Sequence, residues 1–449
     1  MTSDSSARRV SGRRQPLRTY YTVEQNTHVL RSEFCLEFEL FTTLAGAIPS
    51  LPELEAKTEM SHHVHSGMLR AQEFRTRLAD FLLYEPERNR LPTWTNFVRH
   101  LMTAPSRRAL LSALYHVIRP AQLRAYEFHA STTLALNDAP TVELFQRHLE
   151  ALRREIAWGR RFLRRKARTS DTDSATASLF VQAIRDHLRL LGGPMGVPPH
   201  SGASATERYP AWKRPRAMQL EERFEIRSAD RYATPGWPLH EAVPSAYVHF
   251  TELPVIDILG VTIYDGRAIG MPFEFYAEFA RQLWDEARHT MMGFERLRAF
   301  GIDPYKVPIP VGHFTLWANL SVLDRLASLT QVGEACSFEP KRQWVSAAWK
   351  RNDPLSALEH EYDIVDERAH VRFGKRWALE IMKRTGETRT FKQVVQDADW
   401  LFRVKLNRLR KRMGENWVKD IGERFEGCGT NTSPINLAPA LQGMPNIIA

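Results

Sequence analysis

The chain has 449 residues, of which 43% are hydrophobic and 10% aromatic, so it can bury substantial cores and is not a disordered protein. Its 62 Lys and Arg outnumber its 52 Asp and Glu, which gives a net charge of +10, and this excess lies in residues 1–18 and 147–168. Because the remainder is close to neutral, we expect no nucleic-acid partner.

The expected compartment follows from what the chain lacks. No stretch approaches the roughly 18 uninterrupted apolar residues of a membrane span. The first arginines are not followed by the apolar segment of a secretory signal. The three cysteines lie far apart and predict no disulfide framework. We therefore expect a cytoplasmic protein with no membrane partner.

The N-terminal half is predicted to be helical after a disordered basic tail at 1–19. Over 20–168, apolar residues recur at helical spacing and few segments alternate with period two. Residues 169–242 are polar and rich in proline, which is typical of a linker, with one short helix at 178–191. The five helices expected before this linker are 23–48, 51–83, 93–116, 119–135 and 139–168.

The C-terminal half, 243–426, is predicted to be a second helical domain, followed by an extended tail at 427–449. Pro254 is expected to kink or break its first helix. Pro354 suits a first helical turn, with Asp353 as the preceding cap, and Pro340 is expected to end a helix. The fold class is therefore all-α. The helices expected here are 243–265, 272–300, 313–338, 354–384 and 391–424.

Two segments of this second domain share the pattern D-E-x-x-H-x-x-x-G. They read DEARHTMMG at 285–293 and DERAHVRFG at 366–374. On a helix, Glu at position i and His at i+3 lie on one face, so both can bind a single metal ion. The pairs are Glu286 with His289, and Glu367 with His370.

The spacing of two further glutamates strengthens this interpretation. Glu252 lies 34 residues before Glu286, and Glu334 lies 33 residues before Glu367. Half a helix, a short loop and another half-helix together span about 30 residues. The order Glu, ExxH, Glu, ExxH therefore falls on four consecutive helices, which is the arrangement of two-metal carboxylate proteins.

The residue types fit this chemistry. A buried cluster of four carboxylates would be prohibitively costly without cations. Oxygen and imidazole ligands favour Fe or Mn over metals that prefer thiolates. The alternative is that the ExxH residues are surface residues paired with neighbouring arginines.

Four nearby residues are alternative or additional candidates for metal ligands. Asp257 is an alternative to Glu252, and Glu339 is an alternative to Glu334. His360 and Asp363 lie before Glu367 on nearly the same face of the helix. Either of them could be a further ligand or a partner that orients a ligating histidine, but for His360 a position on the helix surface is the favoured interpretation.

With these motifs, the sequence resembles the ferritin-like, non-haem di-metal carboxylate superfamily, and most closely its poorly characterised bacterial branch. The resemblance covers about 243–385 well and 28–165 more loosely. It implies two tandem ferritin-like four-helix bundles, the second with an intact site. It also implies two iron ions, with manganese as the alternative, which react with O₂ to oxidise a bound small organic substrate.

The first bundle resembles a degenerate copy. Glu59 and His62 match a helix-two motif, and Glu127 would be the helix-three carboxylate. In the helix-four motif, Trp158 stands three residues after Glu155, where histidine is expected, and an indole cannot ligate a metal as an imidazole does. The alternative left open here is one ion bound by a histidine cluster: His62, His63 and His65.

We therefore expect an oxidase or oxygenase, although the fold alone does not decide the reaction. The alternatives are a peroxide-detoxifying dimetal enzyme and a non-enzymatic iron-binding or structural helical protein. The chain contains neither a GxGxxG nor a CxxC motif, so reducing equivalents would come from an external donor or from the substrate. A homodimer stays open.

Overall fold

A computed structural model of the chain shows an all-α protein, as the sequence predicts: about 76% of the described residues are helical and strands are almost absent among them. The predicted tails at 1–19 and 427–449 lie outside the described residues, as does the end of the helix expected at 391–424. The structure describes residues 20–165, 171–197, 207–225, 227–228 and 242–413.

The chain forms two compact units that alternate along the sequence. Unit 2 includes two stretches, 37–72 and 94–103, that the sequence assigns to the first bundle, because they pack with the C-terminal half. Unit 1 comprises Met1–Leu36, Glu73–Thr93 and Ala104–Arg208, and unit 2 comprises Glu37–Gln72, Trp94–Thr103 and Tyr209–Ala449.

The helices of the N-terminal half differ from prediction in two places. The helix expected at 93–116 is two helices, since Pro105 lies in the turn between them. The helix expected at 178–191 begins at Asp171, so the polar stretch before it is not linker. The elements are α1 (Val23–Ala47), η1 (Ile48–Ser50), α2 (Leu54–Asp80), α3 (Pro92–Leu101), α4 (Arg107–Ala113), η2 (Leu114–Ile118), α5 (Arg119–Thr132), α6 (Ala139–Arg165) and α7 (Asp171–Leu190).

The C-terminal half departs from prediction mainly between 311 and 350. One expected helix is three shorter segments, and Pro340 does not end a helix but lies in the first turn of α13, where its missing N–H removes no hydrogen bond. The elements are α8 (Ala242–Phe250), α9 (Leu253–Ile269), α10 (Phe273–Ala299), η3 (Pro304–Lys306), α11 (Val311–Trp317), α12 (Val322–Leu326), η4 (Ala327–Glu334), α13 (Phe338–Lys350), α14 (Pro354–Thr385) and α15 (Phe391–Met413). Two short strands, β1 (Arg227–Ser228) and β2 (Ile309–Pro310), pair in parallel.

Local sequence signals explain the limits of the long helices in unit 2. The predicted break near Pro254 is confirmed, because α8 ends at Phe250 and α9 begins at Leu253. Asp353 caps α14 by accepting a hydrogen bond from the Ser356 amide, as its position predicts. Gly386 ends α14 in the left-handed conformation, with φ of 67°.

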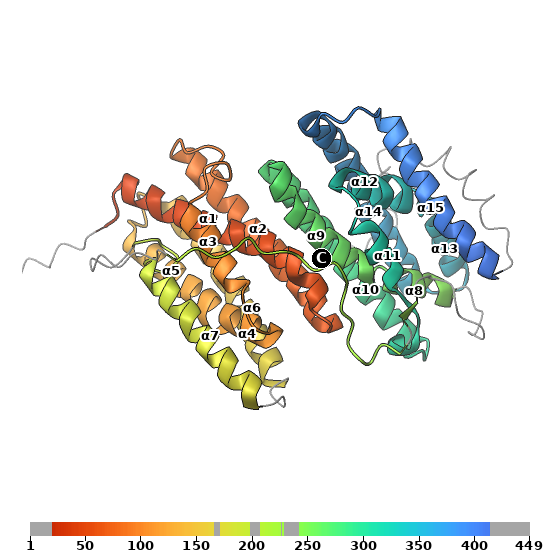
Figure 1. Cartoon of the computed structure of the whole chain (residues 1–449), viewed down its shortest axis with the longest axis horizontal. Coiled ribbons are helices and arrows are strands. Elements are labelled where there is room, and N and C mark those ends of the chain that lie inside the picture. The colour runs from red at the N-terminus through yellow and green to blue at the C-terminus, as the bar shows by residue number, and fades with distance from the viewer. Residues whose placement is uncertain (1–19, 166–170, 198–206, 226, 229–241, 414–449) are drawn as a thin grey trace, which may run out of the picture. The chain divides into compact units, whose positions relative to one another are not determined.

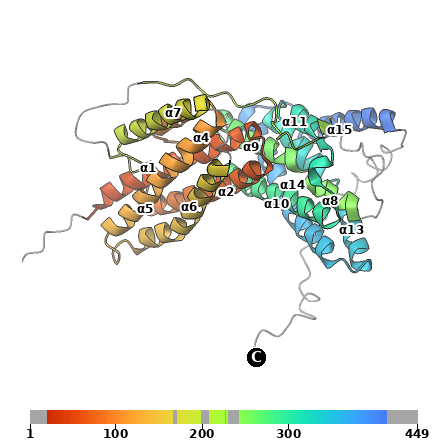
Figure 2. The same ribbon diagram turned by 90° about the horizontal axis from the view of Figure 1, so that it is seen from below.

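Close helix packing positions the shared motif. α8 and α9 pack along α10, while η4 and α13 pack along α14 (Figures 1 and 2). The glycine that ends each motif lies at one of these contacts. A Cβ at Gly293 would be 2.2 Å from the Phe250 backbone nitrogen in α8, and a Cβ at Gly374 would be 1.7 Å from Thr330 Oγ1 in η4. Glycine therefore lets each ExxH helix approach the segment that leads to an isolated glutamate.

The stretch 243–269, which comprises most of α8 and all of α9, is long and apolar enough to cross a membrane. However, 94% of its apolar 18-residue window is buried within the described structure. A buried position is typical of a core helix in a soluble protein, and the burial of this stretch fits that role.

Candidate metal centre

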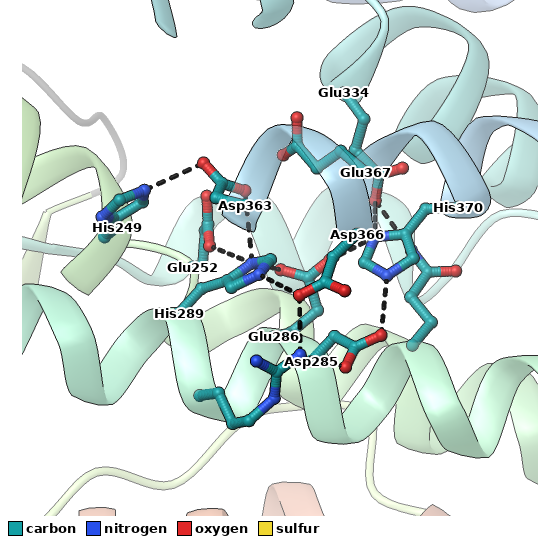
Figure 3. Close-up of polar contacts among 12 residues, drawn as sticks. His249, Glu252, Asp285, Glu286, His289, Glu334, Asp363, Asp366, Glu367 and His370 are labelled. Carbon is teal, nitrogen blue, oxygen red and sulfur yellow. Dashed lines mark hydrogen bonds and ion pairs between the residues drawn. The ribbon is translucent and has the colours of Figure 1, made fainter. Parts of the chain in front are cut away.

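The six residues predicted as ligands all lie in the interior of unit 2. Each is at most 6% exposed to solvent. Two come from α10, two from α14, one from the turn that precedes α9, and one from the last position of the π-helical segment η4. In this order they are Glu286 and His289, Glu367 and His370, Glu252, and Glu334 (Figure 3).

Three of these residues form one compact group, which we call the Glu334 cluster: Glu286, Glu334 and His370. Each offers an oxygen or nitrogen atom within 4.8 Å of the others. His370 Nδ1 is 3.3 Å from Glu286 Oε1 and 3.8 Å from Glu334 Oε1. Gln282 donates a hydrogen bond of 2.7 Å to Glu334 Oε1, which fixes this carboxylate in place.

A second group, the Asp363 cluster, contains Glu252, His289 and Asp363. His289 Nδ1 lies 3.2 Å from Glu252 Oε2 and 3.5 Å from Asp363 Oδ1. Glu286 Oε2 is 3.9 Å from the same Nδ1 atom, so Glu286 connects the two clusters. The structure thus places Asp363 among the predicted ligands.

Glu367 lies beside these clusters and is not a member of either three-residue group. Its Oε1 is 2.5 Å from Lys341 Nζ, and its Oε2 accepts a hydrogen bond from the Ser337 hydroxyl. Lys341 lies in the first turn of α13, in a segment that was not predicted to be helical, and Ser337 directly precedes α13.

The aspartates of the two motifs orient the histidines reciprocally. Asp285 of the first motif lies 3.3 Å from His370 Nε2 of the second, and Asp366 of the second lies 3.3 Å from His289 Nε2 of the first (Figure 3). Arg288 donates hydrogen bonds to both aspartates. Each imidazole is therefore held at Nε2, and its Nδ1 faces a cluster.

Each of the six residues in the two clusters has one side-chain atom with no hydrogen-bond partner among the described residues. Buried polar atoms almost always have one, so atoms without a partner require an explanation. All six are oxygens or imidazole nitrogens, which are the ligands that Fe and Mn prefer. The residues therefore fit a pair of metal ions. The atoms are Glu252 Oε2, Glu286 Oε1, Glu334 Oε2, Asp363 Oδ1, His289 Nδ1 and His370 Nδ1.

The two central histidines are strongly basic in the metal-free chain. Burial alone would lower the pKa of His370, but Asp285 and Glu286 outweigh burial and raise its pKa to about 10. Burial also opposes the charge on His289, yet Asp363 and Asp366 raise its pKa well above the ordinary value. Protons on these imidazoles therefore offset part of the negative charge that metal ions would neutralise.

The pKa values of two central carboxylates, Glu334 and Asp363, are shifted in opposite directions. Burial, together with the nearby Glu286, raises the pKa of Glu334 well above its usual range. Burial would also raise the pKa of Asp363, but Lys341 and His289 outweigh burial and lower it well below the usual range. The Asp363 cluster thus already has a positive neighbour, whereas the Glu334 cluster contains crowded acids.

The structure separates the alternative residues from the predicted set. Asp257 forms a buried ion pair of 2.6 Å with Lys57, and Glu339 pairs with Arg342 at the surface. His360 is only 2% exposed, so the favoured surface position for it is wrong. Its Nδ1 lies 4.0 Å from Asp363 Oδ2.

Two polar residues at the centre were missed by the sequence analysis. His249 Nε2 lies 2.9 Å from Asp363 Oδ2, and Lys341 Nζ lies 2.6 Å from the same oxygen. His249 stands three residues before Glu252, the same helical spacing as in the ExxH pairs, and this was a usable signal. No sequence signal pointed to Lys341, because it belongs to α13, a helix that was not predicted.

The motif residues of the first half have other partners. Glu127 is 44% exposed and pairs with Arg153, so it does not occupy the buried position expected of a helix-three carboxylate. Glu155 is buried against Arg119 at 3.3 Å, and Trp158 packs edge-on against Tyr115. On α2, ligand atoms of Glu59, His62 and His63 come within 4.8 Å of one another; His63 is buried and the other two are partly exposed.

A cavity of about 100 Å³ opens beside the clusters. Four of the predicted ligand glutamates, together with Ser337 and Lys341, form its polar side. A molecule bound there would have one end at the carboxylates and the rest in apolar surroundings. The apolar side is formed by Val248, Val255, Trp317, Leu329 and Phe402.

Comparisons with known proteins give one match. The profile of a family described as "Protein of unknown function (DUF455)" matches residues 213–412. This range includes every residue of both clusters. The comparisons with curated proteins and with solved structures gave no match.

Proposed function

We propose that this chain is a non-haem dimetal oxidoreductase, which uses two iron ions, or iron and manganese, to oxidise a small organic molecule with O₂. The observation that carries this proposal is the set of six buried ligand atoms without hydrogen-bond partners, which converge from α10, α14, η4 and the turn before α9. When bound, the two ions supply electrons and open coordination positions for O₂.

The protein residues would preorganise this centre. His289 and His370 would bind through Nδ1, because Asp366 and Asp285 hold their Nε2 atoms. Glu286 faces both histidines and would contribute carboxylate oxygens to the positions of both ions.

The other carboxylates would bind at the sides. Glu334 is fixed by Gln282, while Glu252 and Asp363 face the other ion. Glu367 would complete the set after release from Lys341, because glutamates can change their binding mode as the metals change charge.

The substrate would occupy the adjoining cavity. Its volume of about 100 Å³ is smaller than the roughly 150 Å³ of an engineered cavity that binds benzene, so only a small molecule or one end of a larger one fits. The apolar wall excludes water from the side of the centre where the substrate would react.

We further propose that the C-terminal helices form a ferritin-like bundle and that the N-terminal half contains a second, degenerate one. The order of ligand-bearing segments in unit 2 supports the first part, since two ExxH helices alternate with two segments that each supply one glutamate. The buried ion pair between Arg119 and Glu155 supports the second part, because an arginine there balances the glutamate that the helix-four motif would supply to a metal.

Metal reconstitution tests the proposal. We expect the purified chain, loaded anaerobically with Fe²⁺, to retain two ions after desalting and to consume O₂ when a reductant is present. Glu334→Gln should lose metal, while Glu339→Gln, which changes an exposed glutamate five residues away, should not. A wild-type chain that retains no metal would contradict the proposal.

The alternative activities give different results in the same assay. A peroxide-detoxifying enzyme would consume H₂O₂ faster than O₂, whereas an iron-binding protein would take up iron without sustained turnover. We favour the oxidase because the cavity places an apolar wall against the carboxylates, as binding of an organic substrate requires.

A further inference from the structure

Lys341 is a buried cation in contact with the candidate centre. It comes from α13 and is 1% exposed. Its Nζ lies 2.6 Å from Asp363, 2.5 Å from Glu367 and 3.8 Å from Glu252. A buried ammonium with three carboxylate neighbours is a fixed charge of the centre and not a surface residue that happens to be near it.

The charges of the centre can be counted from the ion pairs. Among the described residues, Lys341 is the only Lys or Arg within ion-pair distance of the five central carboxylates. With both histidines neutral, as metal binding requires, one ammonium and five carboxylates sum to minus four, the charge that two divalent ions neutralise. The carboxylates are Glu252, Glu286, Glu334, Asp363 and Glu367.

The two clusters differ in their distance from this charge. In the Asp363 cluster, Lys341 contacts two of the three members, Asp363 and Glu252. In the Glu334 cluster it contacts none. The Asp363 cluster therefore has a lysine ammonium beside it, which stays charged when its histidine binds a metal ion, whereas the Glu334 cluster has none within ion-pair distance.

We propose that Lys341 competes with the second metal ion, so that the Glu334 cluster is loaded first and the Asp363 cluster binds its ion more weakly. This inference rests on the proposed dimetal function and deepens it. A site with one tightly and one weakly bound ion can exchange the weak ion, which provides a route to a mixed Fe/Mn pair.

Electrostatics gives the size of the effect. A charge of +1 about 4 Å from a charge of +2 weakens binding roughly thirtyfold even at the dielectric constant of bulk water, and more strongly in a buried site. Removal of the ammonium should therefore tighten the second binding step by at least about tenfold, since relaxation of the surroundings reduces the full effect.

The experiment is a titration of the full metal-free chain with Mn²⁺ alone. Calorimetry measures the heat of binding, and electron paramagnetic resonance measures the concentration of free Mn²⁺. We expect the wild type to bind two ions in two steps. Lys341→Met preserves the length of the side chain and removes its charge, so the second step should tighten at least tenfold. Lys350→Met, at an exposed position on the same helix, should leave both steps unchanged.

Two further variants assign the steps and do not require that Lys341→Met folds. His370→Ala should abolish the tight step, and His289→Ala should abolish only the weak one. The opposite assignment, or a second step in Lys341→Met that is unchanged or weaker, would overturn the competition. A wild-type chain that binds no Mn²⁺ and no Fe²⁺ would instead contradict the proposed function.

Discussion

Each unit contains a π-helical segment that packs onto a glycine of a long helix. In unit 1, Tyr115 of η2 lies over Gly159 of α6, where an added Cβ would be 2.1 Å from the ring. In unit 2, Thr330 of η4 lies against Gly374 of α14. Such π segments are often found at functional sites, but here the same packing occurs in two different electrostatic surroundings.

The difference lies in the residue that ends or follows the π segment. In unit 1, Arg119 follows η2 directly and neutralises the buried Glu155. In unit 2, Glu334 ends η4 and faces Glu286, a second acid. In unit 1 a buried arginine offsets the charge of Glu155, whereas in unit 2, among the described residues, no Lys or Arg lies within ion-pair distance of Glu286 or Glu334.

The largest expected effect concerns metal content. His370→Ala should remove the ion of the Glu334 cluster and abolish O₂ consumption, because His370 is the only nitrogen ligand there. His62→Ala should leave metal content nearly unchanged. Elemental analysis after anaerobic loading measures both, and normal metal content in His370→Ala would show that this cluster is not a metal site.

The stability of the metal-free chain should respond in opposite directions in the two units. Glu155→Gln leaves a buried guanidinium without its counter-charge and should lower the free energy of unfolding by about 3–5 kcal/mol. Glu334→Gln removes one of several crowded acids and keeps an oxygen that can accept from Gln282, so stability should be unchanged or higher.

Urea denaturation in the presence of a chelator measures this contrast. Glu127→Gln, at an exposed position, is the control and should change stability by no more than about 0.5 kcal/mol. Equal destabilisation by Glu155→Gln and Glu334→Gln would mean that the two units balance their buried charges in the same way.

Most of the correct predictions about the fold and the site came from the spacing of residues along helices. The all-α fold and the positions of Glu252 and Glu334 followed from a helical period and from separations of 34 and 33 residues. These arguments work because ligands at the same height on neighbouring helices are separated by a nearly fixed length of chain.

Contacts between distant segments could not be predicted in this way. The aspartate of each motif was visible as a repeated letter, yet its partner is the histidine of the other motif, about 80 residues away. Lys341 was missed because Pro340 was interpreted as a helix end, although proline is equally acceptable in a first turn.

Smaller effects are expected from the residues that orient the histidines. Asp285→Asn keeps the size of the side chain but weakens its hold on His370 Nε2, so metal affinity should fall by roughly 10- to 100-fold. Arg281→Gln changes a half-exposed partner of the same aspartate and is the matched control, with a smaller loss. An affinity unchanged in Asp285→Asn would assign this aspartate a purely structural role in the pairs with Arg281 and Arg288.

A graded effect is expected from pH, which should change metal affinity continuously rather than abolish it. Because the pKa of His370 is about 10 and that of His289 is also raised, both imidazoles carry a proton at pH 7 in the metal-free chain. A metal ion must displace these protons, so affinity should rise with pH up to the raised pKa values. Each released proton contributes about tenfold per pH unit.

Calorimetry in buffers of different ionisation enthalpy counts the protons released by Mn²⁺. We expect about two or more for the wild type at pH 7, and fewer for His370→Ala, which lacks one of the protonated rings. The difference between the two values isolates the contribution of the Glu334 cluster, where among the described residues no Lys or Arg lies within ion-pair distance of Glu286 or Glu334. If Mn²⁺ releases no protons, then neutral histidines and ionised carboxylates already face one another in the metal-free chain, and the raised pKa values of His289 and His370 are contradicted.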